Sequence, residues 1–307
     1  MGDAALTGRA AGSRGGLATL LKRLRAWTPL NRVATRAVRA GCAPFGGAPE
    51  VVVRHLHRFG PVNSRLPNGR RLRLWSLADD WVSNLVFWRG WRAYEPETAP
   101  LFFRLAARAR LTLDVGAYVG FYSLLAGHAN PEGRVLAFEP LPAIHARLRG
   151  NVARNRLDNV ACVAAAAGRE DGRVALYHVS RGLPSSSSLS RAFMGGGDVT
   201  ATPVEVVRLD RFLAERGIPR VDLVKIDTES TEPDVLAGMR EVLGRDHPTI
   251  VCEVLAGRGS EAALTELLAP LGYEFHLLTP SGPVRRQRVE GHPAWLNYVF
   301  SVGTPWA

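Results

Sequence analysis

The chain has 307 residues, of which 46% are hydrophobic and 22% charged, and its net charge is +11. These values are typical of one large globular domain or two smaller ones, and they exclude a disordered chain and a small disulfide scaffold. No apolar run reaches the ~18–20 residues that a membrane-spanning helix needs. Three widely spaced cysteines, Cys42, Cys162 and Cys252, fit neither a disulfide framework nor a metal site, so we expect a reducing, cytoplasmic location.

The positive charge belongs to the N-terminal third of the chain. Residues 1–110 contain 19 basic and 6 acidic residues, whereas residues 111–307 contain 20 and 22. Only two of the 39 basic residues are lysines, Lys22 and Lys225, so the other 37 are arginines. A nucleic-acid-binding surface usually mixes both residue types with aromatic residues along one stripe. Because the arginine richness extends over the whole chain, we expect no nucleic-acid partner.

Residues 1–50 form a basic arm with no acidic residue between Asp3 and Glu50. Five apolar residues recur at helical spacing between basic ones, which predicts a short amphipathic helix over residues 17–27. Such a helix could dock on a membrane surface or a partner. The alternative is a flexible tail or a cap packed on the domain.

Residues 51–110 are predicted to form a separate N-terminal cap. Two alternating stretches, Arg54–Phe59 and Arg71–Trp75, flank Pro67-Asn68-Gly69, and Asn-Gly between such runs predicts a β-hairpin. A tryptophan-rich segment follows and ends at Tyr94-Glu95-Pro96-Glu97. Aromatic residues at this density are typical of a core, so we expect them to join the cap to the domain that follows.

Residues 111–307 show short apolar runs that alternate with helical segments. Strands are predicted at 111–115, 134–138, 160–164, 221–227 and 249–253, and helices at 118–128, 141–155, 232–243 and 260–271. This alternation predicts an α/β fold with a parallel sheet covered on both faces. Two late strands, at 274–278 and 297–301, are separated by turn residues, which predicts an antiparallel last strand. An insert at 165–210, with strands at 173–179 and 204–207, is either a substrate lid or a plain loop.

The segment that most specifically indicates a function is a predicted strand-to-helix turn. It begins at Leu111 and contains Asp114, Gly116 and Ala117. Small side chains at such a turn let a ligand approach the backbone closely. In an open parallel sheet, ligands bind at the carboxyl ends of the strands. The next strand ends at Glu139, 23 residues after Gly116 (139 − 116), where an acid can accept both hydroxyl groups of a ribose. Together these features predict a cofactor that contains adenosine.

The glycine spacing decides between cofactors of this class. A dinucleotide site needs G-x-G-x-x-G, but this chain has G-x-x-x-G, with Tyr118 in place of the second glycine and Gly120 as the last. The carboxylate of Asp114 would repel a pyrophosphate, but it suits the positively charged end and the sulfonium of S-adenosylmethionine. We therefore expect S-adenosylmethionine, held by a set of six residues: Asp114, Gly116, Ala117, Tyr118, Gly120 and Glu139.

A second polar cluster is predicted at the end of the strand over 221–227. Lys225 and Asp227 share one face because side chains alternate along a strand. Glu229 follows, and Glu253 ends the neighbouring predicted strand. We interpret these four as the catalytic set, which orients the cofactor and deprotonates a substrate hydroxyl.

The same cluster also has a structural interpretation. Lys225 and Asp227 could form an ion pair without catalytic function, and Glu229 and Glu232 could cap a helix; for Glu232 we favour the cap. A divalent metal between Asp227 and Glu253 is conceivable, but no third ligand is evident, so we predict no metal.

Several longer stretches occur together in a fixed order: Tyr94-Glu-Pro-Glu97, Asp114-Val-Gly-Ala-Tyr-Val-Gly120, Ala137-Phe-Glu-Pro140, Asn151, Asn155, Asn159-Val160, Lys225-Ile-Asp-Thr-Glu229, Glu232 and Cys252-Glu253. In these stretches the chain resembles the FkbM family of S-adenosylmethionine-dependent methyltransferases. The resemblance implies the class I methyltransferase fold, a Rossmann-like sheet of about seven strands with a reversed last strand. It also implies that Asp114, Gly116, Ala117 and Gly120 line the methionine end of the cofactor and that Glu139 holds the ribose.

Two positions depart from the family pattern: the family commonly has Asn where Tyr118 stands and Gly where Ser230 stands. The resemblance implies O-methylation of a hydroxyl on a sugar, polyketide or other small metabolite. Three alternatives stay open: a nucleic-acid methyltransferase that uses the basic residues 1–110, a nicotinamide oxidoreductase, and a non-enzymatic protein that binds an adenosine cofactor. The sequence does not predict the oligomeric state.

Overall fold

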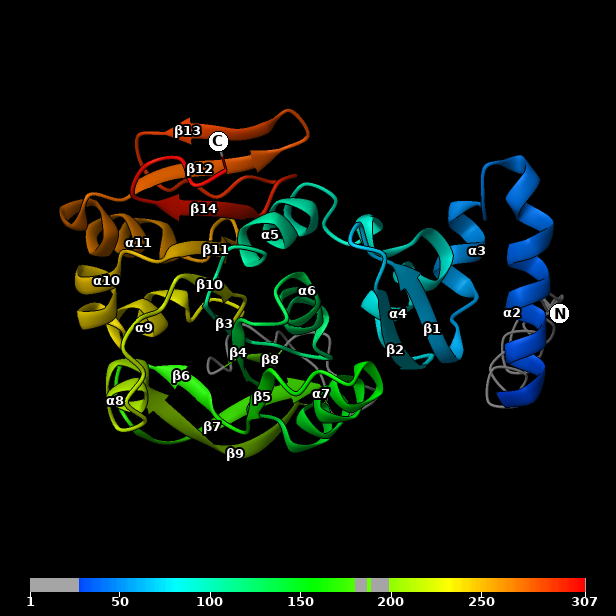
Figure 1. The fold of residues 1–307 in the computed structure, drawn as a ribbon, viewed down its shortest axis with the longest axis horizontal. Coiled ribbons are helices and arrows are strands. Elements are labelled where there is room, and N and C mark those ends of the chain that lie inside the picture. The colour runs from blue at the N-terminus through cyan, green and yellow to red at the C-terminus, as the bar shows by residue number, and fades with distance from the viewer. Residues whose placement is uncertain (1–27, 180–186, 189–198, 307) are drawn as a thin grey trace, which may run out of the picture.

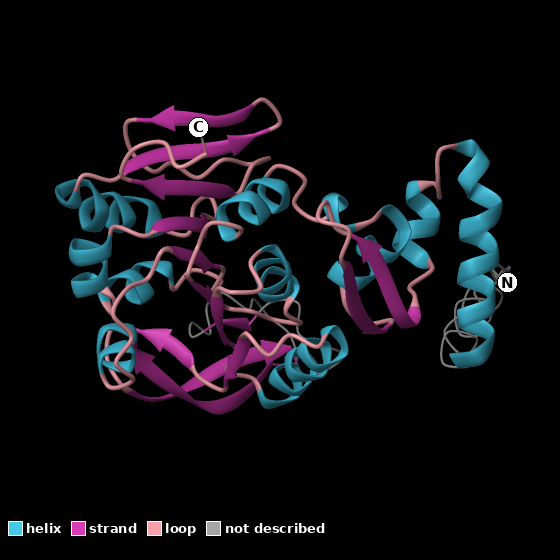
Figure 2. Ribbon diagram, viewed as in Figure 1, coloured by secondary structure: helices cyan, strands magenta, loops and turns pink. Residues whose placement is uncertain are grey.

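A computed structural model describes residues 28–179, 187–188 and 199–306 (Figure 1). The amphipathic helix predicted over residues 17–27 lies outside this part of the chain. The described residues form a central eight-stranded sheet, a four-stranded sheet and a two-stranded hairpin. Helices flank the central sheet on both sides (Figure 2), which confirms the predicted α/β class. In this part of the chain no helix has the length and apolar character needed to cross a membrane.

Five parallel strands form the middle and one side of the central sheet: β3 (Leu111–Val115), β4 (Arg134–Phe138), β5 (Val160–Val163), β10 (Leu223–Ile226) and β11 (Thr249–Glu253). The strand order is β13-β12-β14-β11-β10-β3-β4-β5. Side chains of β3 and β10 are buried throughout, as expected for strands that are covered on both faces. The carboxyl ends of β3, β4, β10 and β11 therefore meet at one edge.

The other side of the sheet contains β12 (Glu274–Thr279), β13 (Gly282–Arg286) and β14 (Asn297–Ser301). β14 runs antiparallel to both of its neighbours, β11 and β12, which confirms the reversed last strand. The sheet has eight strands instead of about seven, because residues 282–286 pair with β12 as an edge strand. This strand is partly to fully exposed and contains two arginines, so no apolar run in the sequence indicates it.

The helices of this domain are α6 (Phe121–Ala129), α7 (Pro142–Asn155), α8 (Leu209–Ala214), α9 (Glu232–Ala237), α10 (Arg240–Asp246) and α11 (Ser260–Leu268) with η4 (Ala269–Leu271). The single helix predicted over 232–243 is two helices, α9 and α10. The carboxylate of Asp210 accepts hydrogen bonds from the N–H groups of Glu241 and Val242 (3.1 and 3.0 Å) and so caps α10. The sequence prediction was wrong here because this cap comes from a distant part of the chain.

The insert forms a second sheet from β6 (Ala166–Gly168), β7 (Gly172–Val179), β8 (Ser187–Ser188) and β9 (Val199–Arg208), in the order β6-β9-β7-β8. β7 and β9 pair antiparallel over eight residues, from Gly172 opposite Val206 to Val179 opposite Val199. The two strands predicted in the insert are thus confirmed, with β9 longer than expected. The described part of the insert is a sheet rather than a plain loop.

The N-terminal part comprises α2 (Thr28–Cys42), η1 (Ala43–Phe45), α3 (Glu50–His55), β1 (Phe59–Arg65), β2 (Arg71–Leu77), α4 (Trp81–Arg89), η2 (Trp91–Ala93) and α5 (Thr98–Ala106). β1 and β2 form the predicted hairpin. Its first strand begins at Phe59 instead of Arg54, because the preceding residues form α3, in which Arg54 is paired with Glu50 one turn earlier (2.9 Å).

Helix α2 packs on this hairpin through polar side chains. Asn31 accepts a hydrogen bond from the N–H of Phe59 (2.7 Å), and the hydroxyl of Thr35 accepts one from the buried guanidinium of Arg58 (2.7 Å). Both Asn31 and Thr35 are buried. Residues 28–42, which we placed in the flexible or amphipathic arm, are therefore a helix held by buried hydrogen bonds.

Two asparagines of α7 join the hairpin to the sheet domain. Asn155 accepts a hydrogen bond from the N–H of Arg73 and donates one to its carbonyl (2.9 and 2.6 Å). Asn151 accepts from the N–H of Trp75 (2.9 Å) and donates to the carbonyl of Val119 (2.9 Å). This docking brings the start of α4, which follows the hairpin, to the carboxyl edge of the central sheet.

Candidate functional site

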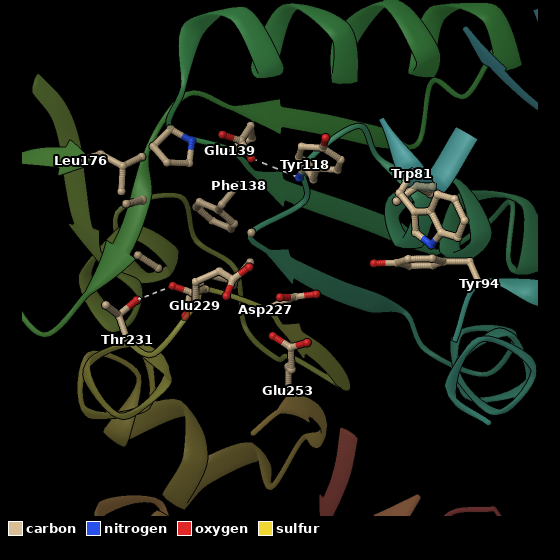
Figure 3. A pocket seen from close by; sticks show the side chains of 17 residues that line it. Trp81, Tyr94, Tyr118, Phe138, Glu139, Leu176, Asp227, Glu229, Thr231 and Glu253 are labelled. Carbon is tan, nitrogen blue, oxygen red and sulfur yellow. Dashed lines mark hydrogen bonds between the residues drawn. The ribbon is translucent and has the colours of Figure 1, made fainter. Parts of the chain in front are cut away.

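A pocket lies at the carboxyl ends of β3, β4, β10 and β11, beside the start of α4 (Figure 3). Six of the ten predicted site residues line it: Gly116, Tyr118, Glu139, Asp227, Glu229 and Glu253. The other four, Asp114, Ala117, Gly120 and Lys225, are not among its lining residues. The structure thus brings the predicted cofactor residues and the predicted catalytic residues into one cavity.

The turn after β3 is built around Gly116. Its φ of +84° lies in the left-handed region, which favours glycine. A Cβ atom on this residue would also lie 1.9 Å from the carbonyl oxygen of Asp227. The glycine therefore lets the loop after β3 contact the loop after β10. Gly120, with φ +92°, instead packs against Leu148 of α7, 2.6 Å from where its Cβ would be.

Glu139 closes the same loop from the end of β4. Its carboxylate accepts hydrogen bonds from the N–H groups of Tyr118 (3.1 Å) and Leu141 (2.9 Å). Burial raises the pKa of Glu139 to about 7. Beside it, Phe138 and Leu176 form an apolar wall (Figure 3). A carboxylate next to an apolar wall fits the ribose and the adenine of S-adenosylmethionine.

Asp114 lies beneath this loop, where it is 1% exposed. Its carboxylate accepts a hydrogen bond from the hydroxyl of Ser123, and burial raises its pKa to about 6. On the neighbouring strand its register partner is Lys225. Asp114 thus lies between the loop after β3 and the second polar cluster, outside the pocket lining. That it contacts the cofactor stays a prediction.

Lys225 is fully buried in β10. Its ammonium lies 3.4 Å from a carboxylate oxygen of Asp227 and 5.1 Å from the centre of the Tyr122 ring. Burial lowers the pKa of Lys225, but the carboxylates of Asp227, Glu95 and Glu253 outweigh it and raise the pKa above its ordinary value. The lysine therefore keeps its charge in this buried position.

Asp227, Glu229 and Glu253 converge where β10 and β11 end (Figure 3). Burial and the nearby carboxylate of Asp227 raise the pKa of Glu253 to about 10, although Lys225 opposes the shift. The shift favours the protonated form of Glu253, which lies in the pocket wall beside Asp227 and the lysine that pairs with it.

Glu232 is 2% exposed at the start of α9. It accepts hydrogen bonds from the N–H groups of Thr228 (3.3 Å) and Ser230 (3.0 Å) and from the Thr228 hydroxyl (3.2 Å). It therefore fixes the loop that precedes α9. This loop contains Glu229 and Ser230, which have φ values of +56° and +84°.

Three residues of the N-terminal part, none of them among the ten predicted site residues, also reach the site. Trp81 and Tyr94 line the pocket, where we had expected both to be core residues (Figure 3). Glu95 accepts hydrogen bonds from the hydroxyl of Tyr122 (2.5 Å) and the side-chain amide of Asn297 (3.0 Å). The Tyr94-Glu-Pro-Glu97 stretch was the sequence signal for these residues. It is far from the ends of β10 and β11 in the sequence, so its closeness to them in space could not be predicted from local patterns.

Among residues 28–179, 187–188 and 199–306, no three His, Cys, Asp or Glu side chains lie close enough together to hold a metal ion. The absence of a metal stays a prediction.

Comparison with known proteins identifies relatives of the chain. The sequence model of the methyltransferase FkbM domain matches residues 114–276, more than half of the chain. The chain is 31% identical over 199 residues to the 31-O-demethyl-FK506 methyltransferase FkbM of Streptomyces tacrolimicus, an alignment that covers 57% of this chain and 75% of that one. It is 27% identical over 184 residues to Methyltransferase 1 of Beauveria bassiana, covering 55% and 74% of the two chains.

A solved structure, that of methyltransferase FkbM from Methylobacillus flagellatus, superimposes with a TM-score of 0.42 at 15% identity. The superposition covers 63% of this chain and 43% of that one. The match over residues 114–276 contains both the glycine turn after β3 and the carboxylates after β10 and β11. This chain therefore belongs to the FkbM family of S-adenosylmethionine-dependent methyltransferases.

Proposed function

We propose that this protein transfers the methyl group of S-adenosylmethionine to a hydroxyl group of a sugar, polyketide or similar small metabolite. The observation that carries this proposal is one pocket that extends from Glu139, past Gly116, to Asp227, Glu229 and Glu253. The name of the Streptomyces relative describes methylation of an oxygen on a demethylated metabolite, which supports an oxygen acceptor.

The cofactor end of the pocket is formed by the ends of β3 and β4. Glu139 would accept hydrogen bonds from the ribose hydroxyls, and Phe138 and Leu176 would contact the adenine. Gly116 leaves the backbone open toward the methionine part. When bound, S-adenosylmethionine supplies an electrophilic methyl group on its sulfonium.

The acceptor end is formed by the carboxylates after β10 and β11. We assign Asp227 as the residue that accepts the hydroxyl proton while the new carbon–oxygen bond forms. Asp227 faces the pocket, and its carboxylate lies 3.4 Å from the ammonium of Lys225, whereas burial and Asp227 raise the pKa of Glu253 and favour its protonated form. Lys225 is then a positioning residue, because it is buried behind Asp227 and does not line the pocket.

The test combines cofactor binding with product detection. The full chain is incubated with S-adenosylmethionine and a panel of hydroxylated sugars and secondary metabolites, and products heavier by one methyl group are sought by mass spectrometry. Asp227→Asn should bind S-adenosylmethionine as the wild type does in calorimetry, yet lose about 100-fold or more in turnover. Glu139→Ala should lose cofactor binding.

The exposed residue Glu132 provides a matched control, because Glu132→Gln changes a carboxylate away from the pocket. It should change neither binding nor turnover. Full turnover of Asp227→Asn would rule out its role as proton acceptor. A wild-type protein that binds neither S-adenosylmethionine nor its demethylated product would contradict the proposed function.

A further inference from the structure

Four polar side chains from distant parts of the chain follow one another in a row that ends beside Asp227. The hydroxyl of Tyr122 donates a hydrogen bond to Oε2 of Glu95 (2.5 Å), and Nδ2 of Asn297 donates to the same oxygen (3.0 Å). Asn297 begins β14, the reversed last strand, and its register partner on β11 is Glu253. The row therefore runs from Tyr122 through Glu95 and Asn297 to Glu253.

One atom of this row lacks a partner. Oδ1 of Asn297 is buried and has no hydrogen-bond donor among the described residues. Residues directly opposite each other in an antiparallel pair share a face, with Cβ atoms about 4.5–5.5 Å apart, so the carboxyl of Glu253 is within reach of this oxygen. An amide oxygen only accepts hydrogen bonds. An ionised Glu253 would leave Oδ1 unsatisfied, whereas a protonated Glu253 can donate to it.

The charges around this row of side chains favour the protonated form of Glu253. Three carboxyl groups, Glu95, Asp227 and Glu253, lie near one buried cation, Lys225. The ionisable groups that face Glu253 and Glu95 from the surrounding elements are Lys225, Asp227, Glu229, Tyr94 and Tyr122. Burial raises the pKa of Glu95 as well, but Lys225 and the hydrogen bonds that Glu95 accepts oppose this shift and stabilise its ionised form. Ionisation of Glu253 as well would place a further, half-buried negative charge beside Asp227, and Lys225 would have to balance all three charges.

We propose that Asn297 is a positioning residue that decides which carboxyl group holds the proton. It accepts a hydrogen bond from protonated Glu253 and donates one to ionised Glu95. Asp227 is thereby left as the ionised carboxylate for the acceptor hydroxyl, a consequence that rests on the proposed function. Burial and Asp227 also raise the pKa of Glu253 to about 10, in agreement with this arrangement.

Infrared difference spectroscopy of the full chain tests the proton position without any substrate, because a protonated carboxyl has its own C=O stretching band. The wild type should show such bands at pH 7.5, and the difference between the wild type and Glu253→Gln should isolate the one that belongs to Glu253. In Asn297→Leu the band should shift in frequency and disappear at a lower pH, because the protonated form has lost its acceptor. Asn63→Leu, which changes an exposed asparagine on β1, should leave the band unchanged.

Asn297→Asp provides a second test if Asn297→Leu does not fold. It keeps the size of the side chain and adds a carboxyl group to the cluster, so a second protonated-carboxyl band should appear near neutral pH. The proposal is overturned if Glu253→Gln removes no band between pH 6 and 9. It is also overturned if the Glu253 band of a folded Asn297 variant keeps the wild-type frequency and titration.

Kinetics provide a second readout once an acceptor is known. Asn297→Leu should lower kcat about 10-fold and shift its pH profile, with the KM for S-adenosylmethionine unchanged, because Asn297 does not line the pocket. Failure of the wild type to bind S-adenosylmethionine would contradict the proposed function alone, since the infrared bands are measured without cofactor.

Discussion

The carbonyl oxygen of Asp227 lies where a side chain on Gly116 would have to be: a Cβ atom there would approach it to 1.9 Å. The loop after β3 and the loop after β10 are therefore in backbone contact. This contact joins the cofactor end of the pocket to its carboxylates.

Gly116→Ala should consequently damage both stability and the site. Strain at φ +84° and displacement of the Asp227 backbone should together cost about 3 kcal/mol in the free energy of unfolding. Binding of S-adenosylmethionine should weaken at least 10-fold. Chemical denaturation and calorimetry measure the two effects.

Gly69→Ala is the matched control for this variant. Gly69 has nearly the same φ, +81°, but no atom of the described residues lies within 4 Å of where its Cβ would be. It should cost only the backbone strain, about 1 kcal/mol, and leave cofactor binding unchanged. Equal losses in the two variants would show that the contact with Asp227 is unimportant.

The two departures from the family pattern, Tyr118 and Ser230, both have positive φ angles, +50° and +84°. The family residues, Asn and Gly, tolerate this region better than Tyr and Ser. The buried hydroxyl of Ser230 also has no hydrogen-bond partner within the part of the chain that the structure describes. Ser230→Gly should therefore raise the free energy of unfolding by about 1 kcal/mol, as measured in urea.

The neighbouring Thr231 provides the comparison for Ser230. Its φ is −112°, and its hydroxyl donates a hydrogen bond to the carbonyl of Thr228 (3.2 Å). Thr231→Gly should therefore destabilise the protein, because it relieves no strain and removes a bond. If Ser230→Gly is as destabilising as Thr231→Gly, the backbone at position 230 is not strained.

The raised pKa of Glu139 predicts a specific pH dependence of stability. Burial raises this pKa to about 7 from an ordinary 4.5, so between these values the folded state binds more protons than the unfolded state. The contribution of Glu139 to stability is therefore fully present below pH 4.5 and is lost as the pH rises through 7. Glu139→Gln should remove this part of the pH dependence, amounting to about 3 kcal/mol, in unfolding curves at pH 5 and pH 8.

Cofactor binding should change with pH in the opposite direction. An ionised Glu139 accepts hydrogen bonds from ribose hydroxyls better than the protonated form, so affinity should rise from pH 6 to pH 8. Glu139→Gln should bind about 10-fold more weakly and show a flatter profile. An unchanged profile in this variant would assign the pH dependence to another group.

Replacement of Lys225 by a neutral residue should lower the free energy of unfolding, because nearby acidic side chains lose their cation. Lys225→Met keeps the approximate side-chain volume but leaves Asp227 and Glu95 without their cation, which should cost about 3 kcal/mol at pH 8. The cost should shrink as the pH falls, because burial raises the pKa of Glu95 and this carboxyl group then takes up a proton. Denaturation of the double variant Lys225→Met/Asp227→Asn supplies the check, since the second change should recover much of the loss.

Much of the fold follows from local patterns in the sequence. The apolar runs of β3, β4 and β11 match the predicted strands because a strand buried on both faces needs a continuous apolar run. The hairpin turn at Asn68-Gly69 is equally local, since Gly69 has the positive φ that such a turn needs. Glu139, Asp227 and Glu253 could be assigned to one edge because parallel strands end together.

The tertiary structure decided what no local pattern encodes. Glu95 and Asn297 are hydrogen-bonded although 202 residues separate them, and Asp114 faces the buried Ser123 rather than the cavity. Trp81 and Tyr94 reach the pocket because the asparagines of α7 bind the hairpin next to α4. The sequence alone thus determined the strands, their acidic ends and the family. The protonation and surroundings of those acids depend on burial and on long-range contacts, which exist only once the chain has folded.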